Sequence, residues 1–374
     1  MRFTVSSTAL SSRLNILSRV INSKNSIAIL DCFLFEVGNG QLEITASDSE
    51  NVMKTALALD EVDGGGRFAV NNRTILDAVK ELPEQPLTLD VDTEQMTVRV
   101  IYQNGLYNFT CQNAEEYPQA QQLGDEAATL QMPEKALLDN ISRSLFAVAN
   151  EQLRLVMNGI YMDLTPESLN IVATDGRKLV RNKYFALKSE QPRSFILQKK
   201  PAALLKNVLT RDDSEVIIRF DDRNAEITFG NTQLSCRLID GRYPNYASVI
   251  PEDNPYELTI DRKTLIGALR RVLPFASESS QQVRLRIAEG KIEVSSEDID
   301  FATSAKEEVT CSYDGAPMSI GFMGTSLVEI LSNLESEEVQ MQFADPSRPC
   351  IIIPSEQPEG EEVLMLLMPM LLND

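Results

Sequence analysis

Paired and turn-forming acidic residues are the side chains of this chain that could support chemistry. Asp212-Asp213 and Asp221-Asp222 each place two carboxylates side by side, and carboxylates are the ligands that divalent cations prefer. Adjacent exposed carboxylates are more often solvated loop residues, and the Asp-Gly pairs at 175–176 and 240–241 have the composition of tight turns. We therefore expect these acids to shape loops and to hold no metal.

Nucleophilic and cofactor chemistry lacks its usual residues. The chain has no histidine, so it cannot form a Ser-His-Asp or Cys-His system or a histidine-based metal cage. Gly64-Gly65-Gly66 is not followed by the Lys-Ser/Thr pair of a phosphate-binding loop. The five cysteines have no C-x-x-C pair and indicate buried thiols in a reducing cytoplasm. The sequence predicts no catalytic residue, no metal and no cofactor.

The distribution of charge points to a different kind of function. The chain carries a net charge of −20, which alone disfavours a nucleic-acid partner. Apolar periodicity predicts six helices, over residues 8–24, 72–82, 133–148, 198–211, 262–275 and 324–334. These helices together carry +10, so the rest of the chain carries −30.

Basic helices on an acidic body favour binding to the phosphate backbone of a nucleic acid. Solvated helix faces are the usual explanation for any one basic helix, but three of these six helices carry +3 or +4 each. No recognition-helix pattern or aromatic stacking platform is present, so the binding is expected to be independent of base sequence.

Three landmarks recur at nearly one spacing along the chain. A strand followed by an amphipathic helix begins at Phe3, Leu130 and Leu258. A strand that ends in an acidic turn recurs at Asp48, Asp175 and Asp298, and a second strand-helix unit recurs at Val70, Leu197 and Phe322. The offsets all lie between 123 and 128 residues, which indicates an internal triplication.

The repeat predicts the fold class and the domains. Each unit holds two helices among short alternating strands, which is typical of the α+β class with helices on one face of antiparallel sheets. A chain of 374 residues exceeds the roughly 250–300 residues of a single core. We expect three domains, over residues 1–126, 127–253 and 254–374. The apolar run from Val363 to Leu372 is too short to span a bilayer, so we expect a cytoplasmic protein with no membrane partner.

Several motifs, in this order and spacing, resemble the bacterial sliding-clamp family, the β subunits of DNA polymerase III, along the whole chain. They are Met1-Arg2-Phe3-Thr4-Val5, Asn158-Gly159, Val172-Ala173-Thr174-Asp175-Gly176, Leu238 to Tyr246 (Leu-Ile-Asp-Gly-Arg-Tyr-Pro-Asn-Tyr) and Met368-Pro369-Met370. The resemblance implies three clamp domains per chain, and a head-to-tail homodimer closed as a ring around double-stranded DNA. It implies a non-enzymatic processivity factor for DNA replication and repair.

The resemblance also implies site residues and partners. Partner proteins would insert a short peptide into an apolar cleft formed by Met157, Thr174, Gly176, Arg177, Leu179, Pro244, Val249, Leu366, Met368, Pro369 and Met370. Those partners would be the catalytic subunit of the replicative polymerase, the clamp loader complex, and other polymerases and repair proteins. DNA would contact Lys24, Arg73, Arg154, Lys199 and Lys200, and the dimer interface would pair Tyr107 and Phe109 with Pro274 and Phe275.

Two other functional classes remain open on the sequence. An enzyme would reveal itself by reproducible turnover of nucleotide or nucleic acid. An acidic scaffold that assembles proteins without encircling DNA would explain the net charge and the apolar C-terminal segment, but it would not explain the basic helices. If Met368 and Met370 only packed into a core, the cleft would be absent.

Overall fold

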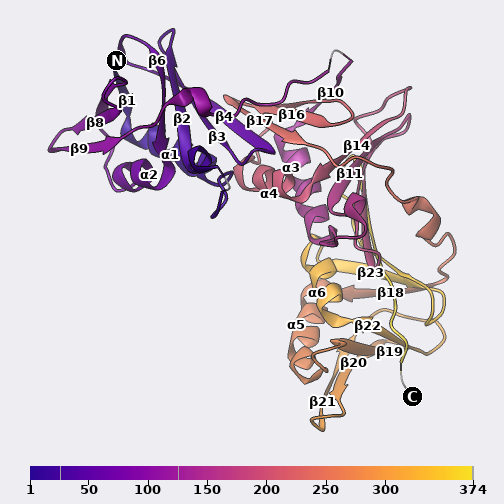
Figure 1. Cartoon of the computed structure of the whole chain (residues 1–374). Coiled ribbons are helices and arrows are strands. Elements are labelled where there is room, and N and C mark those ends of the chain that lie inside the picture. The colour runs from indigo at the N-terminus through magenta and orange to yellow at the C-terminus, as the bar shows by residue number, and fades with distance from the viewer. Residues whose placement is uncertain (26, 125, 373–374) are drawn as a thin grey trace. The chain divides into compact units, whose positions relative to one another are not determined.

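The structure is a computed structural model that describes residues 1–25, 27–124 and 126–372 (Figure 1). The described residues form six α-helices, two in each predicted repeat, as the periodicity predicted. They are α1 (Ser7–Ser18), α2 (Asn72–Val79), α3 (Glu134–Ser144), α4 (Lys199–Val208), α5 (Arg262–Val272) and α6 (Gly324–Ser332). No described helix is long and apolar enough to cross a membrane.

Side-chain caps fix where several helices begin. In α1 the Ser6 hydroxyl accepts a hydrogen bond from the Ala9 amide at 3.1 Å, and Leu10, Leu14 and Leu17 are buried at a spacing of three and four. The prediction that this helix continues to Lys24 was wrong. The helix ends at Ser18, because the Ser- and Asn-rich segment that follows forms turns instead of a further helical turn.

The strands form four antiparallel sheets. Sheet A has the order β5-β1-β7-β8-β9, sheet B β10-β15-β16-β17-β4-β3-β2-β6, sheet C β14-β11-β12-β13-β25-β24-β23-β18, and sheet D β21-β20-β19-β22. In the first repeat the strands are β1 (Arg2–Ser6), β2 (Cys32–Gly38), β3 (Gln41–Ser47), β4 (Asn51–Ala58), β5 (Glu61–Asp63), β6 (Gly66–Asn71), β7 (Pro86–Asp92), β8 (Thr97–Tyr102) and β9 (Gly105–Thr110).

Apart from β5, the later repeats reproduce this series of strands. The second repeat holds β10 (Ala128–Pro133), β11 (Gly159–Leu164), β12 (Leu169–Thr174), β13 (Lys178–Tyr184), β14 (Arg193–Gln198), β15 (Glu215–Phe220), β16 (Asn224–Phe229) and β17 (Thr232–Arg237). The third holds β18 (Tyr256–Asp261), β19 (Gln282–Ala288), β20 (Lys291–Asp298), β21 (Thr303–Thr310), β22 (Met318–Met323), β23 (Glu338–Phe343), β24 (Cys350–Pro354) and β25 (Glu361–Leu367).

Two strand pairs join consecutive repeats into continuous sheets. β17 of the second repeat pairs antiparallel with β4 of the first, and β25 of the third repeat pairs antiparallel with β13 of the second. The chain consequently divides into two compact units that cut across the second repeat. One comprises Met1–Leu138 with Ala203–Leu238, and the other comprises Asp139–Ala202 with Ile239–Asp374.

Each unit has its own apolar core between helices and sheets. In the first unit α1 packs on α2 and on β1, β3 and β4, and the Phe35 and Phe68 rings stack with centroids 5.1 Å apart. In the second unit α5 and α6 lie side by side and cover strands of sheets C and D (Figure 1). The five cysteines are free thiols, four of them buried.

Candidate functional site

The Thr174-Asp175-Gly176 turn connects β12 to β13. The Asp175 carboxylate accepts hydrogen bonds from the amides of Arg177 and Lys178, each at 2.9 Å. The Thr174 hydroxyl donates to the Lys178 carbonyl at 2.7 Å and accepts from the Gly176 amide at 3.0 Å. Gly176 has φ +87°, a conformation that favours glycine. The turn is therefore rigid, and it holds the Gly176 and Arg177 backbone at the surface.

An apolar cluster lies beside this turn. Leu179 on β13 is directly opposite Leu366 on β25, and both belong to a buried cluster with Val172, Ile196 and Tyr243. The sheet joint between the second and third repeats thus runs through the predicted cleft. Of the predicted cleft residues, Leu179 and Leu366 are each 2% exposed, so they belong to the buried core of this unit.

The accessible residues among those predicted for the cleft come from the C-terminal segment and from the loop after Tyr243. Met368 is 40% exposed and Val249 is 50% exposed, while Pro244 is exposed and Pro369 and Met370 are half-buried. The two methionine side chains are unbranched and flexible, so they offer an adaptable apolar surface.

The C-terminal segment is held at both ends of its path. The Met368 amide donates to the Arg177 carbonyl at 2.8 Å, and the Met370 amide donates to the Gly321 carbonyl at 2.7 Å. Met368 and Met370 therefore cross the surface from the acidic turn to the β22 edge. They do not simply continue β25 into the core.

One predicted cleft residue lies deeper than expected. Met157 is 3% exposed and its carbonyl accepts from the Ala149 amide at 3.0 Å, so its side chain is buried and not available at the surface. Prediction from single motifs missed the aromatic residues of the cluster. The Tyr161 and Tyr243 rings stack with centroids 4.6 Å apart, and the Tyr246 hydroxyl donates to Asp163 at 2.7 Å. The Asp-Gly-Arg-Tyr-Pro motif contains Tyr243 and could have indicated an aromatic residue at this site.

Arg154 lies against the same turn. Its guanidinium donates to both carboxylate oxygens of Glu151, at 2.9 and 3.0 Å, and these contacts raise its pKa. A Cβ atom added to Gly176 would lie 3.1 Å from the nearer terminal nitrogen of Arg154. The structure thus places Arg154, predicted to contact DNA, next to the cleft.

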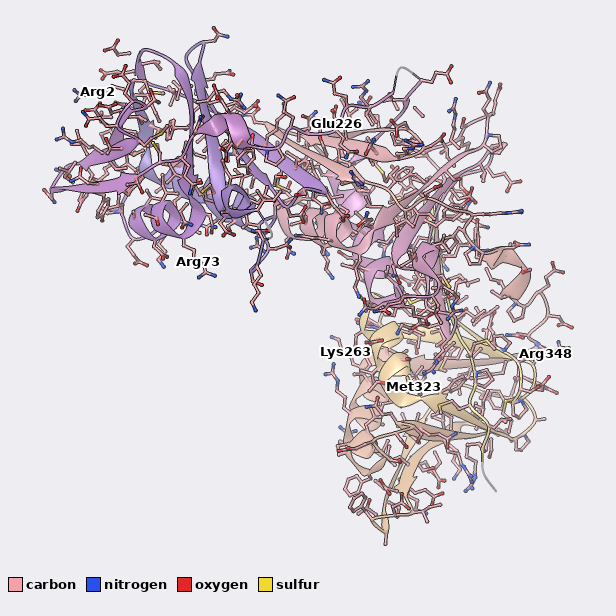
Figure 2. All side chains as sticks on the ribbon, in the orientation of Figure 1. Arg2, Arg73, Glu226, Lys263, Met323 and Arg348 are labelled. Carbon is pink, nitrogen blue, oxygen red and sulfur yellow. The ribbon has the colours of Figure 1, made fainter. Side chains whose placement is uncertain are left out.

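The other predicted DNA-binding residues are surface cations at or near the ends of helices. Lys24 is exposed in the loop after α1, and Arg73 is exposed in the first turn of α2. Lys199 is exposed at the start of α4, and Lys200 beside it is half-buried. Figure 2 shows Arg73 and Lys263 extending from α2 and α5, each away from the sheets of its own unit.

Cations in a first helical turn are unfavourable for the helix itself. The N-terminal end of the helix dipole is positive, so each such cation costs up to about 1 kcal/mol. Arg73, Lys135, Lys199 and Lys263 nevertheless occupy first turns in three repeats. An external anion would compensate this cost.

Some of the basic residues counted on the helices are engaged inside the protein. Arg143 is paired with Glu361, and both side chains are largely buried. Arg262 donates to the carbonyls of Leu331 and Ser336, and Arg271 is paired with Glu307. The predicted charge of +10 on the helices therefore overstates the charge available to a ligand.

The predicted interface residues lie at the margins of sheets A and D. Tyr107 and Phe109 are half-buried on β9, the last strand of sheet A, and the Tyr107 ring lies 4.9 Å from that of Tyr102. Pro274 is exposed and Phe275 is 40% exposed in the 3₁₀ turn Leu273–Phe275 that follows α5.

The acidic pairs shape loops in the structure. Asp212 accepts hydrogen bonds from Ser214, whose hydroxyl and amide lower the pKa of this carboxyl. Asp221 accepts from the amides of Gly124, Arg223 and Asn224. Burial acts to raise the pKa of Asp221, but these amides keep it below its ordinary value. Within the described residues, no group of three or more acidic or cysteine side chains could hold a metal ion.

Comparison with known proteins agrees with this arrangement. The chain matches the family models of the DNA polymerase III beta subunit: the N-terminal domain over residues 1–121, the central domain over 131–245 and the C-terminal domain over 247–370. The beta sliding clamp of Haemophilus influenzae is 27% identical over 98% of this chain and 99% of its own length. That of Escherichia coli K12 is 26% identical over 92% and 93%.

Solved structures share the fold over the full length of both chains. The DNA polymerase III beta subunit of Thermotoga maritima has a TM-score of 0.90 at 27% identity, with 100% of each chain covered. The Pseudomonas aeruginosa sliding clamp bound to griselimycin has a TM-score of 0.94 at 24% identity, also with 100% of each chain covered. The predicted fold class, with three repeated clamp domains, is confirmed. The chain belongs to the DNA polymerase III beta subunit family.

Proposed function

We propose that this protein is a processivity factor: a ring-shaped sliding clamp that encircles duplex DNA without sequence specificity and tethers other proteins to it. The observation that carries the proposal is a pair of sheet edges, β9 and β21, left over by the repeat. Two chains joined head to tail through these edges would close a ring from six domains. We keep residues 1–126, 127–253 and 254–374 as the proposed domain bounds.

Consecutive repeats are joined by one antiparallel strand pair each, β17 with β4 and β25 with β13, and we call such a pair a joint. These two joints within the chain are the argument for a third joint between two chains. In each internal joint, the last strand of one repeat pairs with the strand that follows the acidic turn of the preceding repeat: β17 with β4, and β25 with β13. The last strand of the first repeat, β9, and the strand after the acidic turn of the third repeat, β21, have no such partner within the described part of the chain. Each is an edge strand of its sheet. Pairing β21 of one copy with β9 of another would repeat the same joint a third time.

The chemistry of β9 fits this pairing. Exposed edge strands are commonly protected by charged residues or proline, yet β9 reads Gly-Leu-Tyr-Asn-Phe-Thr and carries neither. On β21 the charges are already paired, Glu307 with Arg271 and Glu308 with Lys291. A neutral edge would therefore meet an edge whose charges are internally compensated.

The internal joints also predict a register. In the first joint Val52 lies opposite Ser235, and Val52 pairs within its own sheet with Ser47, just before the acidic turn. The β21 residue in this position is Ser304, which pairs with Glu297 just before Asp298. Asn108 has the place on β9 that Ser235 has on β17, 127 residues later. Ser304 of one copy would lie opposite Asn108 of the other.

A cysteine pair tests this register. The Asn108→Cys/Ser304→Cys variant should form a covalent dimer on mild oxidation, whereas Asn108→Cys with Arg286→Cys, two strands farther into sheet D, should not. The readout is the mass on a denaturing gel. Equal cross-linking of both variants, or of neither, would contradict the register.

Exposed and half-buried cations supply the proposed DNA contact. Lys24, Arg73, Arg154, Lys199 and Lys200 would make phosphate contacts, which carry no sequence information and weaken with salt. Topology would hold the ring in place, and weak phosphate contacts would let it slide. The net negative charge of the remaining surface would keep DNA off the outside.

The apolar cleft beside the acidic turn would bind the partner peptides. Its exposed Met368 and Val249 would contact the apolar anchors of a peptide, and the flexible Met368 side chain would suit anchors of varied shape. The partners would be the catalytic subunit of the replicative polymerase, the clamp loader complex, and other polymerases and repair proteins. The griselimycin-bound structure of the Pseudomonas aeruginosa clamp supports a ligand-binding role for this fold.

The protein would act in the cytoplasm and would catalyse no reaction. The net charge of −20 favours one alternative, an acidic scaffold that assembles proteins without binding DNA. The cations in the first turns of α2 and α4 favour the clamp, because a scaffold would gain nothing from an arrangement that opposes the helix dipole.

A further inference from the structure

We infer that the tip of the β20–β21 hairpin is an apolar anchor that binds a second copy of this chain. Ile299 and Phe301 lie in this tip and are 83% and 78% exposed. The inference rests on the proposed pairing of β21 with β9 and adds to it a pair of side chains that bind outside the paired strands.

The apolar character of the hairpin surface is concentrated at its tip. The solvent-facing residues of β20 and β21 are polar or charged, among them Glu297, Ser304 and Lys306. Single exposed apolar residues are ordinary on protein surfaces, but two large ones within three residues on a polar hairpin form a small patch of the kind that marks a contact site.

The tip is held in one conformation before any partner arrives. The Asp298 carboxylate accepts hydrogen bonds from the amides of Asp300 at 3.0 Å and Phe301 at 3.2 Å. The Ala302 amide donates to the Ile299 carbonyl at 3.3 Å, and Ala302 has φ +50°. A fixed tip loses little conformational freedom on binding, so more of the apolar contact is retained as affinity.

The register proposed above decides which part of the second copy the tip would reach. With Ser304 opposite Asn108, Thr303 lies opposite Phe109, and the tip extends past the end of β9. There the Cys111 amide of each chain donates to the Met96 carbonyl at 3.0 Å, which ties this segment to the turn between β7 and β8. Phe109 and Met96 are both half-buried and offer apolar surface at that end.

The tip is therefore continuous with the proposed joint, and this selects a second copy over an unrelated protein as its occupant. The two strand edges contribute mostly backbone hydrogen bonds. The tip would add two large side chains to the interface, and a few such residues commonly dominate the affinity of an interface.

Sedimentation equilibrium of the full chain tests the inference. We expect the Ile299→Ser/Phe301→Ser variant to raise the dimer dissociation constant about tenfold to a hundredfold over the unchanged protein. Leu153→Ser is the matched control, because Leu153 is 95% exposed and lies on a different loop; it should leave the constant unchanged. Since the tip side chains are exposed, the thermal midpoint of the monomer should not change in either variant.

The possible outcomes distinguish a failure of the hairpin-tip anchor from a failure of the proposed pairing of β9 with β21. If the unchanged chain stays monomeric at every concentration, the proposed pairing of β9 with β21 is wrong, and the proposed role of the hairpin tip is wrong as well. If the chain dimerises and the Asn108–Ser304 cross-link forms, but the tip variant dimerises as tightly as the unchanged chain, the anchor alone is wrong. The tip would then belong to a contact with another protein.

Discussion

At the scale of single residues, the proposed cleft depends on a few hydrogen bonds that fix a turn beside a buried apolar cluster. The side chains of Thr174 and Asp175 form hydrogen bonds with the backbone of the three residues that follow. The Arg177 carbonyl in turn accepts a hydrogen bond from the Met368 amide. The position of Met368 is thus set by backbone contacts, while its side chain remains free to adapt to a ligand.

The exposed side chain of Met368 should contribute to peptide binding without contributing to folding. We expect Met368→Asp to weaken the binding of a partner peptide at least tenfold, because an apolar peptide anchor would desolvate the new carboxylate. Phe185→Asp is the matched control, since Phe185 is also 40% exposed. Fluorescence anisotropy of a labelled polymerase-derived peptide measures the effect. Equal affinity of the two variants would remove Met368 from the site.

The sequence indicated which residues belong to the candidate site better than it indicated their burial and their hydrogen-bond partners. The Thr-Asp-Gly motif led directly to the turn, and the family resemblance supplied the buried residues Leu179 and Leu366. The sequence could not show that Arg143, Arg262 and Arg271 are engaged within the fold, because their partners lie 36 to 218 residues away along the chain. Long-range pairing of this kind changes the charge that a surface presents and leaves no local pattern.

At the scale of elements, local signals place the helices well and the sheet joints poorly. An apolar spacing of three and four predicted all six helices, and the one large error was the end of α1. The joints β4–β17 and β13–β25 pair strands about 180 residues apart. No short-range pattern specifies such a partner, so the sequence indicated the repeat but not how one repeat is joined to the next.

The N-cap of α5 gives a pH-dependent prediction. The Asp261 carboxylate accepts from the Thr264 amide at 2.6 Å, and hydrogen bonds from the Thr264 side chain and backbone hold the pKa of Asp261 below its ordinary value. A depressed pKa in the folded state stabilises the protein above the unfolded pKa, near pH 4, and this contribution is lost as the pH falls through the folded value.

We therefore expect Asp261→Ala to lower the free energy of unfolding by about 1 kcal/mol at pH 7, and the difference to vanish as the pH approaches 2. Asp261→Asn should retain most of the cap at both pH values. Urea unfolding of the three proteins as a function of pH measures this. A difference between the unchanged protein and Asp261→Ala that stays constant down to pH 2 would contradict the role of the carboxylate.

At the scale of the whole molecule, the repeat leaves one strand edge at each end of the series. Two of the three possible joints are made within the chain, and β9 and β21 are the strands in the corresponding positions that have no such partner among the described residues. Closure by a second copy would satisfy both edges of both chains. It would also explain why β9 carries no charge or proline to protect it from aggregation.

Retention on DNA of different topology tests the central claim most directly. After loading by a clamp loader onto nicked circular DNA, the protein should stay bound through gel filtration at a salt concentration that abolishes simple phosphate binding. Cutting the circle once should release it, because a ring can slide off an end. The account predicts long retention on the circle and rapid loss after linearisation; equal dissociation from circular and linear DNA would contradict it.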